Sequence, residues 1–108
     1  MYYVYLLRCA GGSLYAGITT DPARRFAEHA GLGGRGARYT AAHPPLRMEA
    51  VWTASDRSAA SALEARLKTL SRPQKERLLS GAAPRGWDLT PYTRIPVSPS
   101  GSPEEPGP

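Results

Sequence analysis

The sequence predicts one small α/β domain whose strands and helices follow in the order β-β-α-β-α-α. Apolar residues alternate along two N-terminal stretches joined by a glycine-rich turn, which is the pattern of a β-hairpin. Further along, apolar residues recur at helical spacing after residues that commonly cap helices. At 108 residues the chain is long enough to bury one core and too short for two.

The first two strands are predicted over residues 2–9 and 14–19. Residues 2–9 carry apolar side chains on both alternating sets, which is typical of a central strand covered on both faces. The turn at residues 10–13 has the sequence Ala-Gly-Gly-Ser, and a second alternating stretch follows it. The two strands are therefore expected to form a hairpin.

The length of the hairpin loop decides which residues face each other. A strict two-residue turn would set Tyr5 opposite Ile18, whereas a three-residue or bulged loop would set it opposite Gly17. In the second register Tyr5 and Tyr15 lie on one face, because side chains alternate along a strand with a period of two. The sequence leaves both registers open, and a shared site for the two tyrosines requires the second.

The first helix is predicted to begin at Asp21-Pro22, where the aspartate caps the helix and the proline takes the first helical position. Gly31 ends it. Arg25 and His29 are four residues apart, so they lie one turn from each other on a face away from the apolar stripe. A histidine at a helix C-terminus also interacts favourably with the helix dipole, which gives His29 a purely structural explanation as well.

Three further elements complete the expected order. A glycine- and arginine-rich loop over residues 32–44 leads to a third strand over residues 46–53, which alternates in hydrophobicity. A second helix is expected over residues 57–70. The serine, proline and glutamine within residues 71–74 predict a capped start for a third helix, which ends near Gly81.

Glu64 is the most informative carboxylate of the sequence. It falls at the edge of the apolar stripe of the second predicted helix, beside Leu67. A carboxylate in this position is unfavourable unless it is paired or bound to a cation. Lys68, one turn further on, offers an ordinary surface ion pair, and a metal ion is the other solution. The helix considered alone favours the ion pair.

Basic residues give the chain a formal net charge of +5 and a pI near 9.8, and most of them are arginine. The excess is concentrated between Arg24 and Arg47, where five arginines accompany one acid, Glu28. Arginine's planar fork suits phosphate recognition, so a polyanion is the expected partner. Charges on solvated faces would give the same composition, so the basic excess alone does not establish a polyanion partner.

The composition also bears on the compartment. No apolar run approaches the roughly 18 residues of a membrane span, so we expect no contact with a membrane. No secretion signal is recognised, and the expected location is the cytoplasm. The single cysteine, Cys9, excludes an internal disulfide and a multi-cysteine zinc site.

A change in composition near Gly81 predicts a domain at residues 1–81 and a tail at residues 82–108. The tail holds seven of the eleven prolines and has no apolar periodicity, so we expect it to be mostly disordered. Some of its residues are apolar enough to dock either on the domain or on a partner. They are Trp87, Leu89, Tyr92 and Ile95.

Five features of the chain occur in a known order and spacing. They are Tyr3-Val4-Tyr5, Tyr15-Ala16-Gly17 ten residues later, the helix with Arg25 and His29, the loop sequence GARYT, and Glu64 in a helix that ends in Leu-Ser-Arg. With these features the chain resembles the GIY-YIG nuclease superfamily, and most of all its small, stand-alone, largely uncharacterised bacterial branch. The resemblance covers residues 2 to about 80.

The resemblance implies a three-stranded antiparallel sheet flanked by helices, and an endonuclease that hydrolyses DNA phosphodiester bonds with one divalent cation, Mg²⁺ or Mn²⁺. Tyr5 and Tyr15 would be the two motif tyrosines. Arg25 would bind phosphate, His29 would be its companion on the helix, and Glu64 would be the metal ligand. One carboxylate with several retained waters suits Mg²⁺, and an arginine offsets charge on the phosphoryl oxygens.

A tyrosine can take a proton from water only if nearby cations lower its pKa, which is near 10 when unperturbed. Arg25 and the metal would be those cations, and the sequence does not say which tyrosine is the base. In the nucleic-acid surface that we expect, arginines follow the backbone and Tyr39 stacks a base or packs down on the domain. That surface comprises Gly17, Arg24, Arg35, Arg38, Tyr39, Arg47 and Lys68.

Two departures from the superfamily pattern bear on activity. The first motif lacks the glycine of the family name, and Ile18 stands where repair-type members carry a lysine. We recognise no appended DNA-binding domain, so we expect weak substrate selection by this chain alone. Two other functions therefore stay open: a nucleic-acid-binding module without turnover, and an interaction domain whose tail binds a protein partner that selects the substrate.

Overall fold

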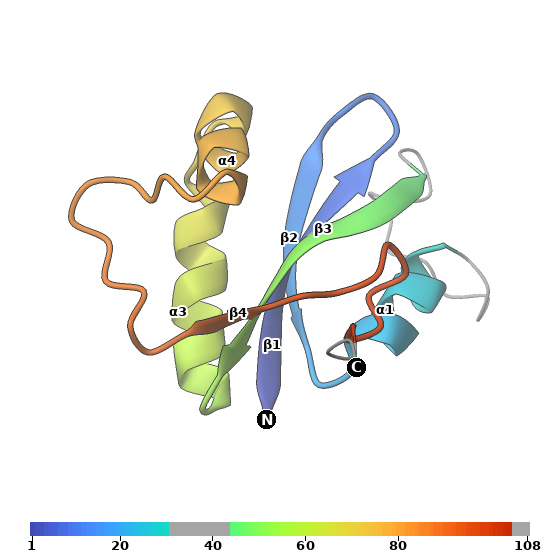
Figure 1. Ribbon diagram of the computed structural model, residues 1–108, viewed down its shortest axis with the longest axis horizontal. Coiled ribbons are helices and arrows are strands. Elements are labelled where there is room, and N and C mark those ends of the chain that lie inside the picture. The colour runs from blue at the N-terminus through green and yellow to red at the C-terminus, as the bar shows by residue number, and fades with distance from the viewer. Residues whose placement is uncertain (31–43, 105–108) are drawn as a thin grey trace.

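The computed structural model describes residues 1–30 and 44–104. Within them, four strands form one antiparallel sheet in the order β2-β1-β3-β4. In chain order the elements are β1 (Tyr2–Cys9), β2 (Leu14–Thr19), α1 (Pro22–His29), β3 (Pro45–Ala54), α3 (Arg57–Lys68), α4 (Arg72–Leu79) and β4 (Thr93–Ile95). Figure 1 shows α3 and α4 on one side of the sheet and α1 on the other.

β1 lies inside the sheet and contributes to two apolar cores, as the apolar residues on both of its faces predict. Its even-numbered residues pack with the apolar stripe of α3. This cluster includes Val4, Leu6, Ala60, Leu63 and Leu67. Its odd-numbered residues form the second cluster on the side of α1. That cluster consists of Tyr5, Leu7, Cys9, Met48 and Val51.

The hairpin adopts the register that a shared tyrosine site requires. Tyr5 pairs with Gly17, which puts Tyr5 and Tyr15 on the same face. The loop is longer than two residues, and the Cys9 amide donates to the Ser13 carbonyl oxygen at 2.9 Å to close it. Two glycines in this loop have φ of +90°, a left-handed conformation that other residues rarely adopt.

The helix starts follow the capping signals of the sequence. The Asp21 side chain accepts a hydrogen bond from the Arg24 amide at 3.1 Å, ahead of Pro22 in the first turn of α1. At the start of α4 the Ser71 and Gln74 side chains each accept from the other residue's amide, at 3.3 and 2.8 Å. Both predicted caps are confirmed, and the first fixes where α1 leaves the hairpin.

The prediction of three strands is wrong, because the sheet has a fourth strand, β4, from the segment that we expected to be mostly disordered. β4 pairs antiparallel with β3, with Arg94 opposite Trp52. The outer edge of β3 would otherwise present unpaired amides and carbonyls, and a three-residue strand covers part of it. Three residues are too few to give an alternating pattern that sequence analysis can recognise.

The described part of this segment, residues 82–104, docks on the domain at both cores. Before β4, Trp87, Leu89 and Tyr92 pack against the α3-side cluster, and the Tyr92 hydroxyl donates to the Ala59 carbonyl oxygen at 2.7 Å. Beyond Tyr92, further apolar residues pack against the α1-side cluster. The sequence left open whether these residues dock on the domain or on a partner, and in the structure they dock on the domain. The division near Gly81 into two units stays a prediction.

Arg35, Arg38 and Tyr39, which we expected to contact nucleic acid, lie outside the ranges that the structure describes. Within those ranges, no helix is both long and apolar enough to cross a membrane.

Candidate active site

Three aromatic residues from β1, β2 and α1 meet on the α1 side of the sheet. The Tyr5 hydroxyl and His29 Nε2 lie 2.8 Å apart and share a hydrogen bond. The His29 ring stands nearly edge-on to both tyrosines, with ring centroids 5.9 Å from Tyr5 and 5.4 Å from Tyr15. Tyr5 and His29 are only 1% and 2% exposed, whereas Tyr15 is half-buried. The sequence prediction that these residues form one group is therefore met by the geometry.

Gly17 makes room for the Tyr5 side chain. Tyr5 lies against the β2 backbone, where a Cβ on residue 17 would be 2.5 Å from Cζ of the Tyr5 ring and 2.9 Å from Cε2. Carbon atoms in contact are normally about 3.5–4.0 Å apart, so any side chain at this position would displace the ring. The glycine of the second motif therefore has a structural function in placing the tyrosine of the first.

Arg25 lies one helical turn before His29, and its positive charge acts on the Tyr5 hydroxyl. Burial nevertheless dominates and raises the pKa of Tyr5 to about 12, although Arg25 acts in the opposite direction. Arg25 thus acts on the pKa of Tyr5 in the expected downward direction, but the effect of burial is larger. In this arrangement Tyr5 is a neutral phenol at pH 7.

Burial also determines the state of His29. Burial, and after it the Arg25 charge, lower the pKa of His29 to about 4, and Glu28 acts weakly in the other direction. His29 is therefore neutral at pH 7, with one ring nitrogen able to accept a hydrogen bond. A neutral ring gains little from the helix dipole.

This burial predicts a pH-dependent stability. An unfolded histidine, with a pKa near 6.5, takes up a proton between pH 6.5 and 5, whereas folded His29 does not. Protonation therefore stabilises the unfolded state relative to the folded state as pH falls. We expect His29 to lower the free energy of unfolding by about 1.5 kcal/mol over this range. Urea titrations at several pH values would measure it.

The matched control is His29→Gln, which keeps a polar side chain but cannot titrate. Glu76 and Asp88 have lowered pKa values and affect stability only at lower pH, equally in both proteins. The difference in slope between wild type and His29→Gln therefore isolates the histidine. Identical slopes would show that His29 is protonated freely in the folded state.

Glu64 on α3 lies close enough for its charge to raise the pKa of Tyr5. Its Oε2 pairs with the Lys68 Nζ at 3.5 Å, and its side chain is 22% exposed. The surface ion pair considered from the sequence is therefore present, and the charge of the same carboxylate also acts on Tyr5. In the described ranges, no group of three or more His, Cys, Asp or Glu side chains lies close enough together to hold a metal ion.

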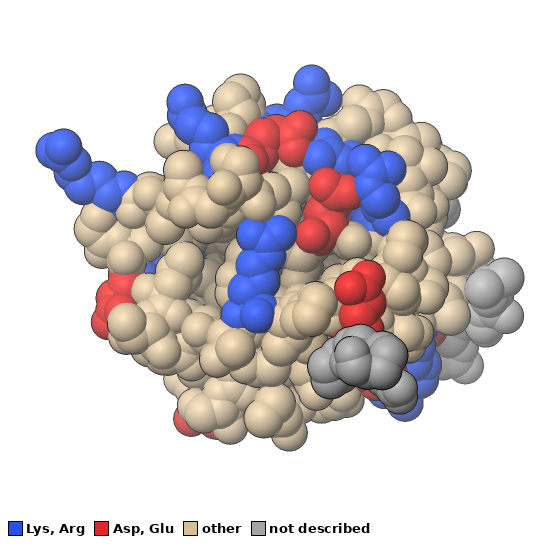
Figure 2. Space-filling view, in the orientation of Figure 1, with Lys and Arg blue, Asp and Glu red and all other residues tan. Residues whose placement is uncertain are grey.

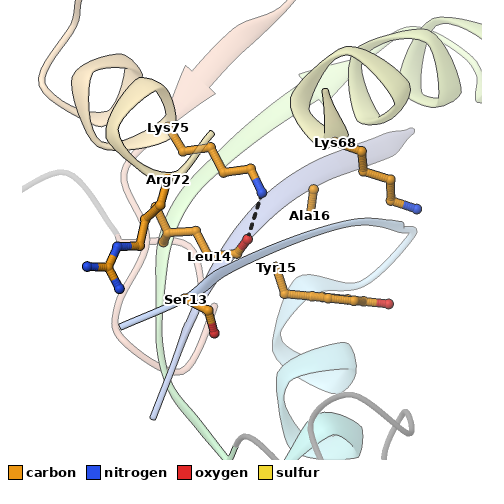
Figure 3. A pocket seen from close by; sticks show the side chains of 7 residues that line it. All are labelled: Ser13, Leu14, Tyr15, Ala16, Lys68, Arg72 and Lys75. Atoms are coloured by element: carbon orange, nitrogen blue, oxygen red, sulfur yellow. Dashed lines mark hydrogen bonds between the residues drawn. The ribbon is translucent and has the colours of Figure 1, made fainter. Parts of the chain in front are cut away.

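A basic pocket continues from this cluster along β2, and we call it the β2 pocket. It has a volume of about 360 Å³. Its lining residues are Ser13, Leu14, Tyr15, Ala16, Lys68, Arg72 and Lys75. Figure 3 shows Arg72 beside Ser13 at one end, Lys75 in the middle, and Lys68 and Tyr15 projecting at the other end. Sequence analysis missed Arg72 and Lys75, which lie on α4, a different helix from that of Lys68.

Two other arginines of the expected nucleic-acid surface do not join the tyrosine cluster. Arg24 is exposed on α1. Arg47 forms an ion pair with Glu49, which also pairs with Arg8 at 3.2 Å, and Arg8 in turn contacts Glu76 of α4 at 2.5 Å. Figure 2 shows acidic and basic side chains intermixed over α4 and the hairpin. In the structure, Arg47 thus belongs to a network that ties α4 to the sheet.

Comparison with known proteins covers most of this chain. The family model of the GIY-YIG catalytic domain matches residues 1–77. A UPF0213 protein of Vibrio cholerae serotype O1 is 51% identical over 85 residues, which are 76% of this chain and 80% of that protein. A UPF0213 protein of Cupriavidus necator is 49% identical over 74 residues, which are 68% and 78% of the two chains.

A solved structure is also similar to this chain. The solution NMR structure of a UPF0213 protein from Bacillus halodurans matches with a TM-score of 0.48 and 41% identity, covering 79% of this chain and 89% of that one. The residues matched by the family model include the tyrosine cluster, Glu64 and the whole lining of the β2 pocket. The whole segment that carries β4, residues 82–104, lies beyond them.

Proposed function

The chain belongs to the GIY-YIG family, and we propose that it acts as a divalent-metal-dependent endonuclease on DNA phosphodiester bonds. The observation that carries the proposal is the convergence of five side chains from four elements. The His29 ring contacts the rings of both Tyr5 and Tyr15, and the charges of Arg25 and Glu64 both act on the Tyr5 hydroxyl. A base, a cation for phosphate and a carboxylate for a metal are the groups that phosphodiester hydrolysis needs.

We assign the attacking water to Tyr15 and a positioning function to Tyr5. Tyr15 is half-buried and lines the open β2 pocket, so substrate and water can reach it. Tyr5 is almost fully buried, and its hydroxyl is engaged with His29. In this assignment Tyr15, as a phenolate, would take the proton of the water as the water oxygen attacks phosphorus and the bond to the leaving ester oxygen breaks.

Arg25 would stabilise the phosphoryl oxygens. Its guanidinium acts on both tyrosines, and its ion pair with Glu28 is long, at 3.8 Å. Its side chain is 30% exposed, so it can exchange this partner for a phosphate without leaving the cluster. A planar donor fork at the developing negative charge stabilises the transition state more than the ground state.

Glu64 would hold the metal ion. Mg²⁺ is commonly bound by one or two carboxylates with retained waters and substrate oxygens, so a single, partly exposed carboxylate fits it. When bound, Mg²⁺ would polarise a phosphoryl oxygen and stabilise the leaving oxygen. Lys68 would then give up its place at the carboxylate and become available to the substrate.

The test incubates the purified chain with supercoiled and branched DNA in Mg²⁺, Mn²⁺ or EDTA. We expect cutting in the presence of metal only, and no cutting by Glu64→Gln, which preserves side-chain size but removes the charge that holds the metal. Gel electrophoresis of the products, at saturating protein, gives the rate.

Lys68→Gln is the comparison variant, because it breaks the same ion pair from the other side, and saturating protein compensates for the DNA contact that Lys68 itself would make. If Glu64 only supports the helix, both variants lose a few tenths of a kcal/mol of stability and cut equally. Metal-independent cutting, or Glu64→Gln cutting like wild type, would contradict the proposed metal site.

A nucleic-acid-binding module without turnover is the second candidate, and two observations favour it. Lys68 occupies the Glu64 carboxylate, and Tyr5 is neutral at pH 7. DNA binding with no cutting in either metal would support this module and overturn the nuclease proposal.

A further inference from the structure

The β2 pocket carries positive charge from three side chains of two helices. Lys68 comes from the end of α3, and Arg72 and Lys75 come from α4. No Asp or Glu belongs to its lining residues, and among the described residues only Lys68 of the three forms an ion pair. A concave surface with three cations and no lining acid is suited to an anion.

The cations leave hydrogen-bonding capacity for a ligand. Lys75 Nζ donates one hydrogen bond to the Leu14 carbonyl oxygen at 3.0 Å, shown in Figure 3, and an ammonium has three donors. Arg72 Nη1 makes one long contact, 3.4 Å, with the Gly11 carbonyl oxygen. Burial lowers the pKa of Lys75, and an anion beside it would act in the opposite direction.

The pocket is continuous with the candidate active site. Tyr15 lines the pocket and also contacts the His29 ring, and Lys68 lines the pocket while it pairs with Glu64. An extended anion that reaches the tyrosine cluster would therefore pass over Lys68 and meet Lys75 and Arg72. A nucleic-acid strand carries such charges at regular intervals along its backbone.

Resting on the proposed function, we infer that the β2 pocket binds the backbone phosphates of the DNA strand next to the scissile bond. Lys75 and Arg72 contact these phosphates, and Lys68 joins them when it leaves Glu64. The wall formed by Leu14 and Ala16 carries no charge, so the contacts hold the backbone without selecting a sequence. The substrate strand accordingly runs along the outer edge of β2 toward α4.

The test measures binding, so it does not require turnover. Fluorescence anisotropy with a labelled single-stranded oligonucleotide and its duplex, in EDTA, compares wild type with Arg72→Gln/Lys75→Gln over a range of salt concentrations. Each lost phosphate contact reduces the salt slope by about 0.7 for single strands and 0.9 for duplex. We therefore expect a slope lower by about 1.4 or 1.8, and binding weaker by roughly tenfold or more in 0.1 M salt.

The matched control is Arg77→Gln/Arg85→Gln. It removes the same charge from residues that line a different surface, where Arg77 lies on the other side of α4. We expect the control to retain most of the affinity, which separates a local contact from the effect of net charge. Equal losses in both double variants would overturn the inference.

Because Lys75 donates to an edge strand, its loss could act through stability alone. Arg72→Gln removes only a long hydrogen bond, and thermal melting monitors the fold of each variant. A lower salt slope in Arg72→Gln with an unchanged melting temperature supports the phosphate contact. If the wild type cuts DNA but both pocket variants bind DNA as tightly as the wild type, the inference fails while the proposed function stands. If the wild type never cuts DNA but the pocket variants bind it more weakly, the phosphate contact stands while the proposed function fails.

Discussion

Tyr15→Phe is expected to slow DNA cleavage by about a thousandfold, within the range of about 10²–10⁴ that a general acid or base contributes. Phenylalanine keeps the ring that stands against His29, so the packing of β2 against α1 is retained. What is lost is the hydroxyl of a residue that lines the β2 pocket, where we propose that water and substrate meet. Single-turnover cleavage at saturating protein and Mg²⁺ would measure the loss, with anisotropy confirming unchanged DNA binding.

Tyr5→Phe is the control for this assignment. It removes the hydroxyl that lies 2.8 Å from His29 Nε2, deep in the cluster. Loss of a buried partner costs about 1–3 kcal/mol, so we expect a lower free energy of unfolding and a smaller loss of cleavage than in Tyr15→Phe. If Tyr5→Phe is the more damaging variant for cleavage while remaining folded, the functions of the two tyrosines must be exchanged.

Local signals in the sequence predicted most of the scaffold around these tyrosines. The caps at Asp21 and Ser71 are set by side chains within three residues, which sequence reasoning reads directly. The hairpin register followed less directly, because it depends on loop length. Requiring Tyr5 and Tyr15 on one face selected the register with Tyr5 opposite Gly17, which the structure has.

The features that sequence reasoning missed depend on contacts between distant residues. β4 exists because β3 offers an open edge, and no pattern within three residues reveals that. The pKa of Tyr5 follows from how deeply β1 is covered, so a neighbouring arginine was not enough to predict its direction. Arg72 and Lys75 gain significance only where α4 lies beside β2, a juxtaposition of residues about 60 apart in the chain.

Gly17→Ala is expected to lower the free energy of unfolding by about 1–3 kcal/mol, as overpacking a filled interior does. The added methyl group would lie 2.5 Å from Cζ of Tyr5, so the ring must move and its hydrogen bond to His29 is disturbed. Because the same ring helps to place the cluster, cleavage should fall together with stability. Urea unfolding and single-turnover cleavage of the same preparation measure both effects.

A double-mutant cycle with Tyr5→Leu shows whether this overlap is the cause. Leucine removes the ring atoms that the methyl group would meet, so Gly17→Ala should cost less than half as much in the Tyr5→Leu background, a coupling of about 1 kcal/mol. Additive costs would mean that the ring does not require the glycine. DNA binding then separates the remaining explanations, because Gly17 was also expected at the nucleic-acid surface. A methyl group that weakens binding in both backgrounds acts on the DNA, whereas one that weakens it only beside Tyr5 acts through the tyrosine cluster.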